Sequence, residues 1–162
     1  MSFVVVVVII IGIFALYAQL QGTSNATQTA LFTRQLAPQA AQFYRGDYTG
    51  FDAQKAISLG FVPTNWQKSN AKIEDPSGNT VEIAGTGDAF TITFNDVTDD
   101  TCQAVLSTLR GDRLFRTARK NRTERLTLGG NNPGKAYNAN PAEIAEACAE
   151  DLDSLVLTFD GS

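Results

Sequence analysis

The sequence predicts an α+β fold in which a long N-terminal α-helix packs on a small antiparallel β-sheet with short helices around it. Three observations lead to this prediction: an uncharged apolar start, helical spacing of apolar residues to about residue 44, and short alternating segments separated by turns after it. The length of 162 residues suits about one domain. We expect residues 1–25 to be the apolar half of a stalk helix and residues 26–162 to be a globular head that includes its distal half.

The apolar start is long enough to cross a membrane. No charged residue precedes Arg34, and residues 3–20 are almost continuously apolar. As a helix, roughly 18 residues span about 27 Å, which matches the hydrocarbon core of a bilayer. Three interpretations are open: a secretory signal, a plain membrane anchor, and a stalk that packs against copies of itself. The start lacks the basic residues of a signal, and no basic residue follows closely on Leu20 to orient an anchor, so the third is favoured. The side chains expected in that packed core are Phe3, Val5, Val8, Ile10, Ile13, Phe14 and Tyr17.

The middle of the stalk is its weakest part. Residues 19–25 are polar and include Gly22, which predicts a break in the helix between Gln19 and Asn25. Helical spacing returns over residues 26–44 and stops at the Arg-Gly-Asp sequence of residues 45–47. A short helix over residues 51–59 and strands over residues 71–74, 80–83 and 90–94 are predicted next.

The second half of the chain alternates helices and strands. Asp99 or Asp100 is expected to cap a helix that continues through Leu109. Pro141 is expected to open a second helix, which carries Cys148. The strands predicted here are residues 114–119 paired with 124–128, and a closing strand over residues 155–159.

Cys102 and Cys148 are the two cysteines of the chain. In an exported head, two cysteines are first interpreted as one disulfide, and a loop of about 45 residues would gain about 4 kcal/mol from it. Two free buried thiols remain the alternative. A metal site is disfavoured because the chain has no histidine and no C-x-x-C pair.

The same lack of histidine removes the usual general base at neutral pH. We therefore expect no catalytic residues, no metal and no cofactor, and no enzyme activity. The carboxylate pairs at residues 99–100 and 150–151 are interpreted as helix caps and solvated ends, with a calcium site as the sharper alternative.

Arginine recurs at every third position between residues 110 and 125. The series consists of Arg110, Arg113, Arg116, Arg119, Arg122 and Arg125. It is either a solvated face with local ion pairs to Asp112 and Glu124, or a basic face that contacts acidic surface on the next subunit, or a site for DNA or an anionic glycan. The net charge of −4 argues against nucleic acid as the main partner.

Three stretches carry a resemblance to a known family. They are GDYTG at residues 46–50, AISLGFVP at residues 56–63, and FTITFNDV at residues 90–97, which leads into Cys102. With the apolar start and the final apolar strand in the same order, the chain resembles the type IVb pilins, in particular the PilS-like pilins carried by conjugative plasmids.

The resemblance implies a major pilin that polymerises into an extracellular pilus, for attachment or for cell–cell contact such as conjugative mating. Its implied partners are copies of itself, the pilus assembly machinery in the inner membrane, and a bacterial or host cell surface. Such pilins reside in the inner membrane before assembly, and a peptidase trims them to a first residue that is then N-methylated; here that residue would be Met1. The cysteines would bracket the variable C-terminal region, residues 102–148.

One position departs from the family pattern. Pilins carry a glutamate at the fifth mature position, which pairs with the amine of a neighbour, whereas this chain has Val5. Recruitment of a subunit to the filament would then depend on apolar packing or on a different partner for the amine. Two alternatives remain for the whole chain: a minor pseudopilin of a secretion system, and a membrane-anchored binding module that does not polymerise.

Overall fold

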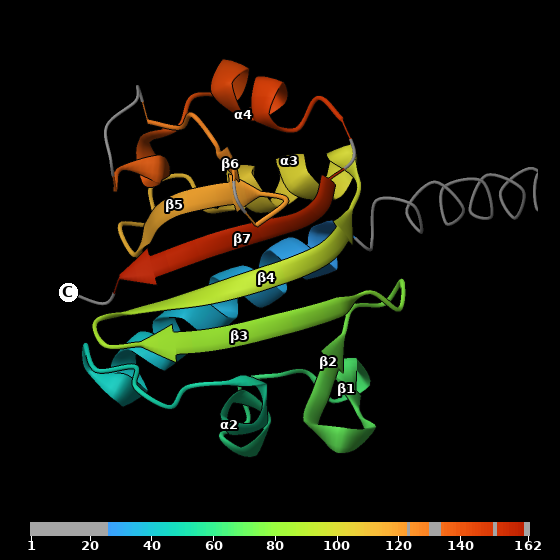
Figure 1. The fold of residues 1–162 in the computed structure, drawn as a ribbon, viewed down its shortest axis with the longest axis vertical. Coiled ribbons are helices and arrows are strands. Elements are labelled where there is room, and N and C mark those ends of the chain that lie inside the picture. The colour runs from blue at the N-terminus through green and yellow to red at the C-terminus, as the bar shows by residue number, and fades with distance from the viewer. Residues whose placement is uncertain (1–25, 123, 130–133, 151, 161–162) are drawn as a thin grey trace, which may run out of the picture.

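The computed structural model describes residues 26–122, 124–129, 134–150 and 152–160. Within these ranges the chain forms a seven-stranded antiparallel sheet with a long helix behind it, as Figure 1 shows. The predicted α+β fold is therefore confirmed. The residues expected in the packed core of the stalk, the expected break between Gln19 and Asn25, and the expected membrane-crossing segment lie outside the described residues. No helix in the part of the chain that the structure describes has the length and apolarity to cross a membrane.

The helix over residues 26–44 packs one face on the sheet. Its buried side chains include Phe32, Leu36 and Ala40, at the three-to-four spacing that the sequence predicted. Phe32 stacks on Trp66, with 4.5 Å between ring centroids, and meets Phe94 edge-on at 6.4 Å. These contacts fix the position of the helix across the sheet.

The end of this helix is where the sequence placed it. Arg45 and Gly46 have φ angles of 49° and 89°, in the left-handed region that ends helices. Tyr44, in the last turn, contacts Tyr48 and Phe51. The chain therefore reverses direction immediately after the helix and returns along the edge of the sheet.

The C-terminal strand lies in the middle of the sheet. The strand order is β1-β2-β3-β4-β7-β5-β6, so β7 pairs with β4 on one side and with β5 on the other. Leu155, Leu157 and Phe159 alternate along β7 and are buried. The strands are β1 Gln67–Lys68, β2 Lys72–Glu74, β3 Thr80–Thr86, β4 Ala89–Val97, β5 Phe115–Lys120, β6 Glu124–Arg125 and β7 Leu152–Asp160.

Three short α-helices flank the sheet. They are α2 Ala53–Ser58, α3 Asp99–Thr108 and α4 Pro141–Ala147, and the 3-10 helices are η1 Thr64–Trp66, η2 Ser69–Ala71 and η3 Ala136–Asn138. Figure 1 places α3 and α4 beside the β5–β6 end of the sheet, and α2 beside β1 and β2. The head therefore has a helix pair at one edge of the sheet and a small subdomain at the other.

Two helix boundaries differ from the prediction. The N-cap of α3 is Thr98, whose side chain accepts a hydrogen bond from the backbone N–H of Thr101, while Asp99 and Asp100 lie in the first turn. There they still favour the helix, because a negative charge complements its N-terminal dipole. The helix α4 ends at Ala147, so Cys148 is its C-cap rather than an interior residue.

The segment 48–52 closes the edge of β3. The backbone N–H of Tyr48 donates to Gly87 O, and that of Gly85 donates to Phe51 O, both at 2.7 Å. A Cβ on Gly85 would collide with the carbonyl oxygen of Tyr48 and would lie 2.8 Å from Phe51 Cβ. Glycine is therefore required at this point of β3 by the close approach of another backbone. The arrangement gives a structural reason for the GDYTG motif, which supplies Tyr48.

Candidate assembly surface

A disulfide joins α3 to the end of α4. Cys102 and Cys148 are 46 residues apart in sequence, and their Cα atoms are 5.6 Å apart. Both residues are buried in the core of the head. The bridge encloses β5 and β6 together with the whole arginine series, so this region is covalently closed on itself. Of the two interpretations of the cysteines, the structure contains the disulfide.

Half of the arginine series is engaged within the head. Arg110 Nε donates to Ala139 O at 2.9 Å. The guanidinium of Arg116 lies 5.7 Å from the centre of the Tyr137 ring, which is within reach of a cation–π contact. Arg122 reaches across the sheet to β3 and β4. These three side chains hold loops and strands of the same chain together.

Arg122 belongs to the turn between β5 and β6. Its Nη2 lies 2.6 Å from Glu82 Oε2 on β3 and 3.3 Å from Asn95 Oδ1 on β4. The φ angles of Asn121 and Arg122 are 52° and 66°, so the turn is left-handed at both residues. The ion pair is half exposed, and its contribution to stability is accordingly small.

The other half of the series has no hydrogen-bond or ion-pair partner among the residues that the structure describes. Arg113, Arg119 and Arg125 are exposed, and none of them contacts a hydrogen-bond acceptor or a carboxylate in the described ranges of the chain. Arg119 on β5 lies directly opposite Arg125 on β6. Like charges at such a cross-strand pair repel, so the sheet retains a local electrostatic cost at this position.

The local ion pairs differ from those expected. Glu124 is 3.5 Å from Lys120 rather than from an arginine, and Lys120 is also 3.5 Å from Glu150. Asp112 accepts a hydrogen bond from the backbone N–H of Leu114 at 3.1 Å and so shapes the turn before β5. The unpaired arginines are therefore not neutralised by their sequence neighbours.

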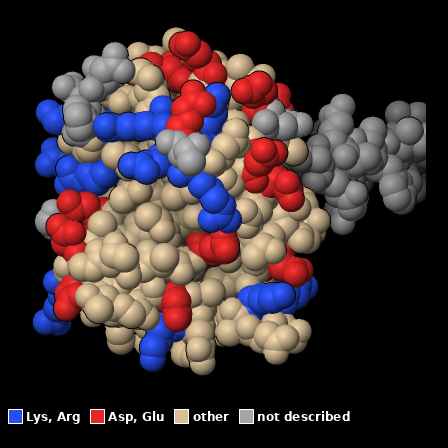
Figure 2. All heavy atoms as spheres, in the orientation of Figure 1, with Lys and Arg blue, Asp and Glu red and all other residues tan. Residues whose placement is uncertain are grey.

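Exposed carboxylates gather at one end of the sheet, which we call the entry end. There β4 ends next to the start of β7, with Val97 opposite Leu152, and α3 begins two residues later. Asp96, Asp100 and Asp153 are exposed at this end, and none of them forms an ion pair with a described residue. Figure 2 shows acidic side chains toward the upper right of this face and basic ones at its upper left.

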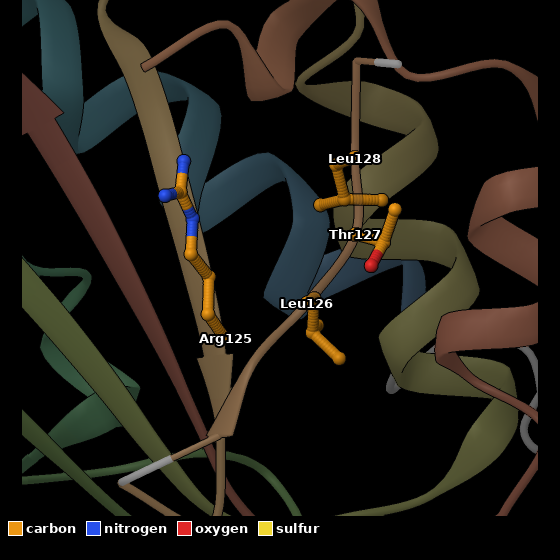
Figure 3. Close-up of a pocket in the computed structure, with 4 residues that line it drawn as sticks. All are labelled: Arg125, Leu126, Thr127 and Leu128. Carbon is orange, nitrogen blue, oxygen red and sulfur yellow. The ribbon is translucent and has the colours of Figure 1, made fainter. Parts of the chain in front are cut away.

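A small cavity lies at the end of β6. One cavity of about 110 Å³ is lined by Arg125, Leu126, Thr127 and Leu128. Figure 3 shows Arg125 directed away from Leu126 and Thr127, so its guanidinium and the threonine hydroxyl do not converge. In the described ranges, no three histidine, cysteine, aspartate or glutamate residues are grouped as metal ligands.

The surroundings shift the pKa of three groups near the helix end, Tyr44, Asp47 and Tyr48. Hydrogen bonds from the hydroxyl and backbone N–H of Thr49 lower the pKa of the Asp47 carboxyl, which is fully exposed. Burial raises the pKa of the Tyr48 hydroxyl, and the nearby charge of Asp160 raises it further. The Tyr48 hydroxyl is buried and has no hydrogen-bond partner among the described residues.

The chain is similar to known proteins in sequence and in fold. A family model described as PilS N terminal matches residues 21–160. The type IVb pilin of Salmonella typhi has a similar structure, with a TM-score of 0.50 and 16% identity over 82% of this chain and 97% of that one. TcpA, a type IV pilin of Vibrio cholerae El Tor biotype, gives a TM-score of 0.51 and 16% identity over 86% of this chain and 99% of that one. No curated protein matches this chain.

Proposed function

Because the chain belongs to the PilS N-terminal family and has the fold of type IVb pilins, we propose that it is the major subunit of a type IV pilus. In this proposal, copies of the chain polymerise into an extracellular filament that serves attachment or cell–cell contact such as conjugative mating. The observation that carries it is the helix over residues 26–44, which is docked on the head and is directly preceded in sequence by an uncharged segment.

The proposal divides the chain into two working parts. Residues 1–25 hold the subunit in the inner membrane and then form the filament core, and residues 26–162 form the head. On the outer face of the helix over residues 26–44, Leu31 and Phe43 are 48% and 57% exposed. Large apolar side chains at that exposure are suited to contacts with neighbouring copies.

The assembly steps follow from the same proposal. Inner-membrane machinery adds subunits to the growing pilus. With Val5 in place of an acidic residue, apolar packing supplies the binding energy of the new subunit. Neither a catalytic residue nor a cofactor has a part in this function.

Electron microscopy of material sheared from cells tests the proposal. Cells that produce the chain should yield thin filaments, and the chain should be their main component. Replacing Ile10 with aspartate should abolish them, because an unpaired carboxylate in a dry or lipid environment costs several kcal/mol. Asn132→Asp adds the same charge in the glycine-rich stretch of the head and serves as the matched control.

Either of two results would contradict the proposal. Absence of filaments from producing cells would favour an anchored module that does not polymerise. Normal filaments from cells with Ile10→Asp would show that residues 3–20 do not form the filament core.

A further inference from the structure

We propose that an open hollow between the end of α3 and η3 binds the carboxylate of an acidic sugar on a cell surface. The hollow has a volume of about 460 Å³, and the residues that line it are Arg110, Gly111, Tyr137, Asn138 and Ala139. We call it the Tyr137 hollow. Sialic acids and uronic acids both carry the carboxylate in question. The inference names the chemistry of a surface to which the pilus attaches, and in this respect it rests on the proposed function.

Two hydrogen bonds hold the walls of the Tyr137 hollow in place. The backbone N–H of Gly111 donates to Tyr137 O, and Arg110 Nε donates to Ala139 O, both at 2.9 Å. The bonded residues belong to two segments that lie before β5 and after β6, and the disulfide encloses both segments. A site whose walls are already fixed loses little conformational entropy when a ligand binds.

The Tyr137 hollow offers hydrogen-bond donors that the chain does not use. Arg110 engages only its Nε, so neither of its Nη atoms has an acceptor among the described residues. The side-chain amide of Asn138 is exposed and has no hydrogen-bond partner in the same ranges. The two Nη groups of a guanidinium can donate parallel hydrogen bonds to the two oxygens of one carboxylate. Arg110 is therefore suited to hold a carboxylate at the mouth of the hollow.

Tyr137 supplies an aromatic wall. The residue is half-buried, and the guanidinium of Arg116 lies over its ring, 5.7 Å from the centre. An aromatic ring packs on the apolar C–H groups of a sugar, while the phenol at its tip can form hydrogen bonds. An arginine fork beside an aromatic ring matches a sugar that carries a carboxylate better than it matches a bare inorganic anion.

The local charge favours an anion. The segments that build the hollow, residues 109–116 and 134–140, contain one acidic residue, Asp112, and four basic residues: Arg110, Arg113, Arg116 and Lys135. None of these five forms an ion pair with a described residue, and the carboxylate of Asp112 accepts the backbone N–H of Leu114. A carboxylate that enters the hollow therefore meets a net positive field.

A single acidic sugar suits the chain better than a nucleic acid or another long polyanion. The net charge of the chain is −4, so the surface away from the hollow repels a polyanion that extends across it. One carboxylate at the end of a glycan meets only the nearby charges, because salt at physiological concentration screens the others beyond about 8 Å. The overall charge therefore favours a small acidic ligand.

The Tyr137 hollow lies at the opposite end of the sheet from the entry end. Phe115, at the start of β5, pairs with Phe159 near the end of β7, whereas the entry end is where β7 begins. The helix over residues 26–44 starts near the entry end, since Phe32 contacts Phe94 late in β4. The uncharged segment before residue 26 thus joins the head away from the hollow. A filament core built from that segment leaves the hollow free to meet a cell surface.

Binding to acidic and neutral glycans tests the inference. The full chain in mild detergent, at about 0.15 M salt, is measured against immobilised sialyllactose, a glucuronic acid oligosaccharide and lactose. We expect at least one acidic glycan to bind about tenfold or more tightly than lactose, because hydrogen bonds to a charged group add to its binding. The two acidic glycans distinguish a sialic acid, as on host cells, from a uronic acid, as in bacterial polysaccharides.

Variants of two residues assign the binding to the hollow. Arg110→Gln removes the guanidinium but keeps a side-chain N–H donor, and Tyr137→Leu removes the ring but keeps an apolar side chain. Each should weaken binding of the acidic glycan by about tenfold or more. Arg119→Gln is the matched control, because it removes an exposed arginine of the same series outside the hollow, and it should bind as the wild type does. An intact disulfide and cooperative urea unfolding verify that each variant is folded.

Each contrary outcome is specific. Equal binding of acidic and neutral glycans, or binding of neither acidic glycan, would overturn the inference. A loss with Arg119→Gln as large as that with Arg110→Gln would also overturn it, since the binding would then be a general effect of positive charge. All of these results leave the proposed function standing, because electron microscopy scores filaments separately. Glycan binding by a chain that forms no filaments would remove the proposed function and keep the binding site.

Discussion

Replacing Gly85 with alanine tests how closely the segment 48–52 must approach β3. The added Cβ would collide with the carbonyl oxygen of Tyr48 and lie 2.8 Å from Phe51 Cβ, well inside normal contact. One of these neighbours is backbone and the other is the first carbon of a buried side chain. No rotation of a side chain can relieve the collision, so the whole segment has to move away from the strand.

The expected cost follows from the contacts that this movement disturbs. Overpacking at a buried site costs about 1–3 kcal/mol. The segment is also held by the hydrogen bonds from Tyr48 N to Gly87 O and from Gly85 N to Phe51 O, both at 2.7 Å. Each is worth about 1 kcal/mol, so we expect a total loss of about 3 kcal/mol or more, a large part of the 5–15 kcal/mol typical of a domain.

The single tryptophan provides the assay. Trp66 is 2% exposed and stacks on Phe32, so its fluorescence should shift to longer wavelength when the head unfolds. Urea unfolding of the full chain in mild detergent should show the midpoint of Gly85→Ala far below that of the wild type.

Gly78→Ala is the matched control for this measurement. Gly78 has a φ angle of +87° but open space around its missing Cβ. The substitution there costs only the backbone strain of a left-handed residue, about 1–2 kcal/mol. If both variants lost the same stability, the close approach at Gly85 would contribute nothing beyond backbone preference, and the reasoning would be refuted.

Three further predictions concern single contacts. Cys148→Ala should lower the free energy of unfolding by about 4 kcal/mol, because it removes the disulfide. By mass spectrometry, the unreduced wild type should weigh two hydrogens less than the reduced chain. Alkylation of both cysteines in native filaments would contradict the bridge. Tyr48→Phe should raise the stability by roughly 1 kcal/mol by removing an unpaired buried hydroxyl. Because the fold raises the pKa of Tyr48, the phenol ionises at lower pH in the unfolded chain than in the folded one. The stability of the wild type should therefore fall above pH ~10, and by more than that of Tyr48→Phe. An equal fall of stability with pH in both proteins would argue against burial of the phenol. Arg122→Ala breaks an exposed ion pair with Glu82 and should cost less than about 1 kcal/mol in the same assay; a loss as large as that of Gly85→Ala would mean that the pair is a structural clamp.

Local patterns in the sequence predicted most of the elements. The alternation of residues 90–94 identified β4, and three-to-four spacing identified the helix that ends at residue 44, because both patterns reflect burial of one face. The strand β1 has only two residues, Gln67 and Lys68, and so has no periodicity to detect. The order of the strands could not be predicted from local patterns either, because the pairing of β7 with β4 joins segments more than fifty residues apart.

The arginine series shows the same limit at the site. Equal spacing in sequence suggested one face, but β5 alternates its side chains and is irregular at Arg116, between the paired residues Phe115 and Thr117. The left-handed turn at Asn121 and Arg122 then reverses the chain. Only the folded backbone decides that Arg119 and Arg125 are neighbours while Arg122 points to β3. The spacing in sequence identifies the basic region, but it does not indicate which of its arginines contact other residues of the chain.

The central position of β7 sets an order of events for folding. Its partners, β4 and β5, are synthesised before it. The two strands cannot become part of one sheet until β7, Leu152–Asp160, is available to pair with both. Pairings between distant segments form slowly, since a long loop must close before any contact rewards it. A chain still being synthesised therefore exposes two unpaired strand edges, which are the sites where strands from different chains associate wrongly. The last nine residues of the described head complete the sheet, and the head becomes a unit fit for assembly only when they are in place.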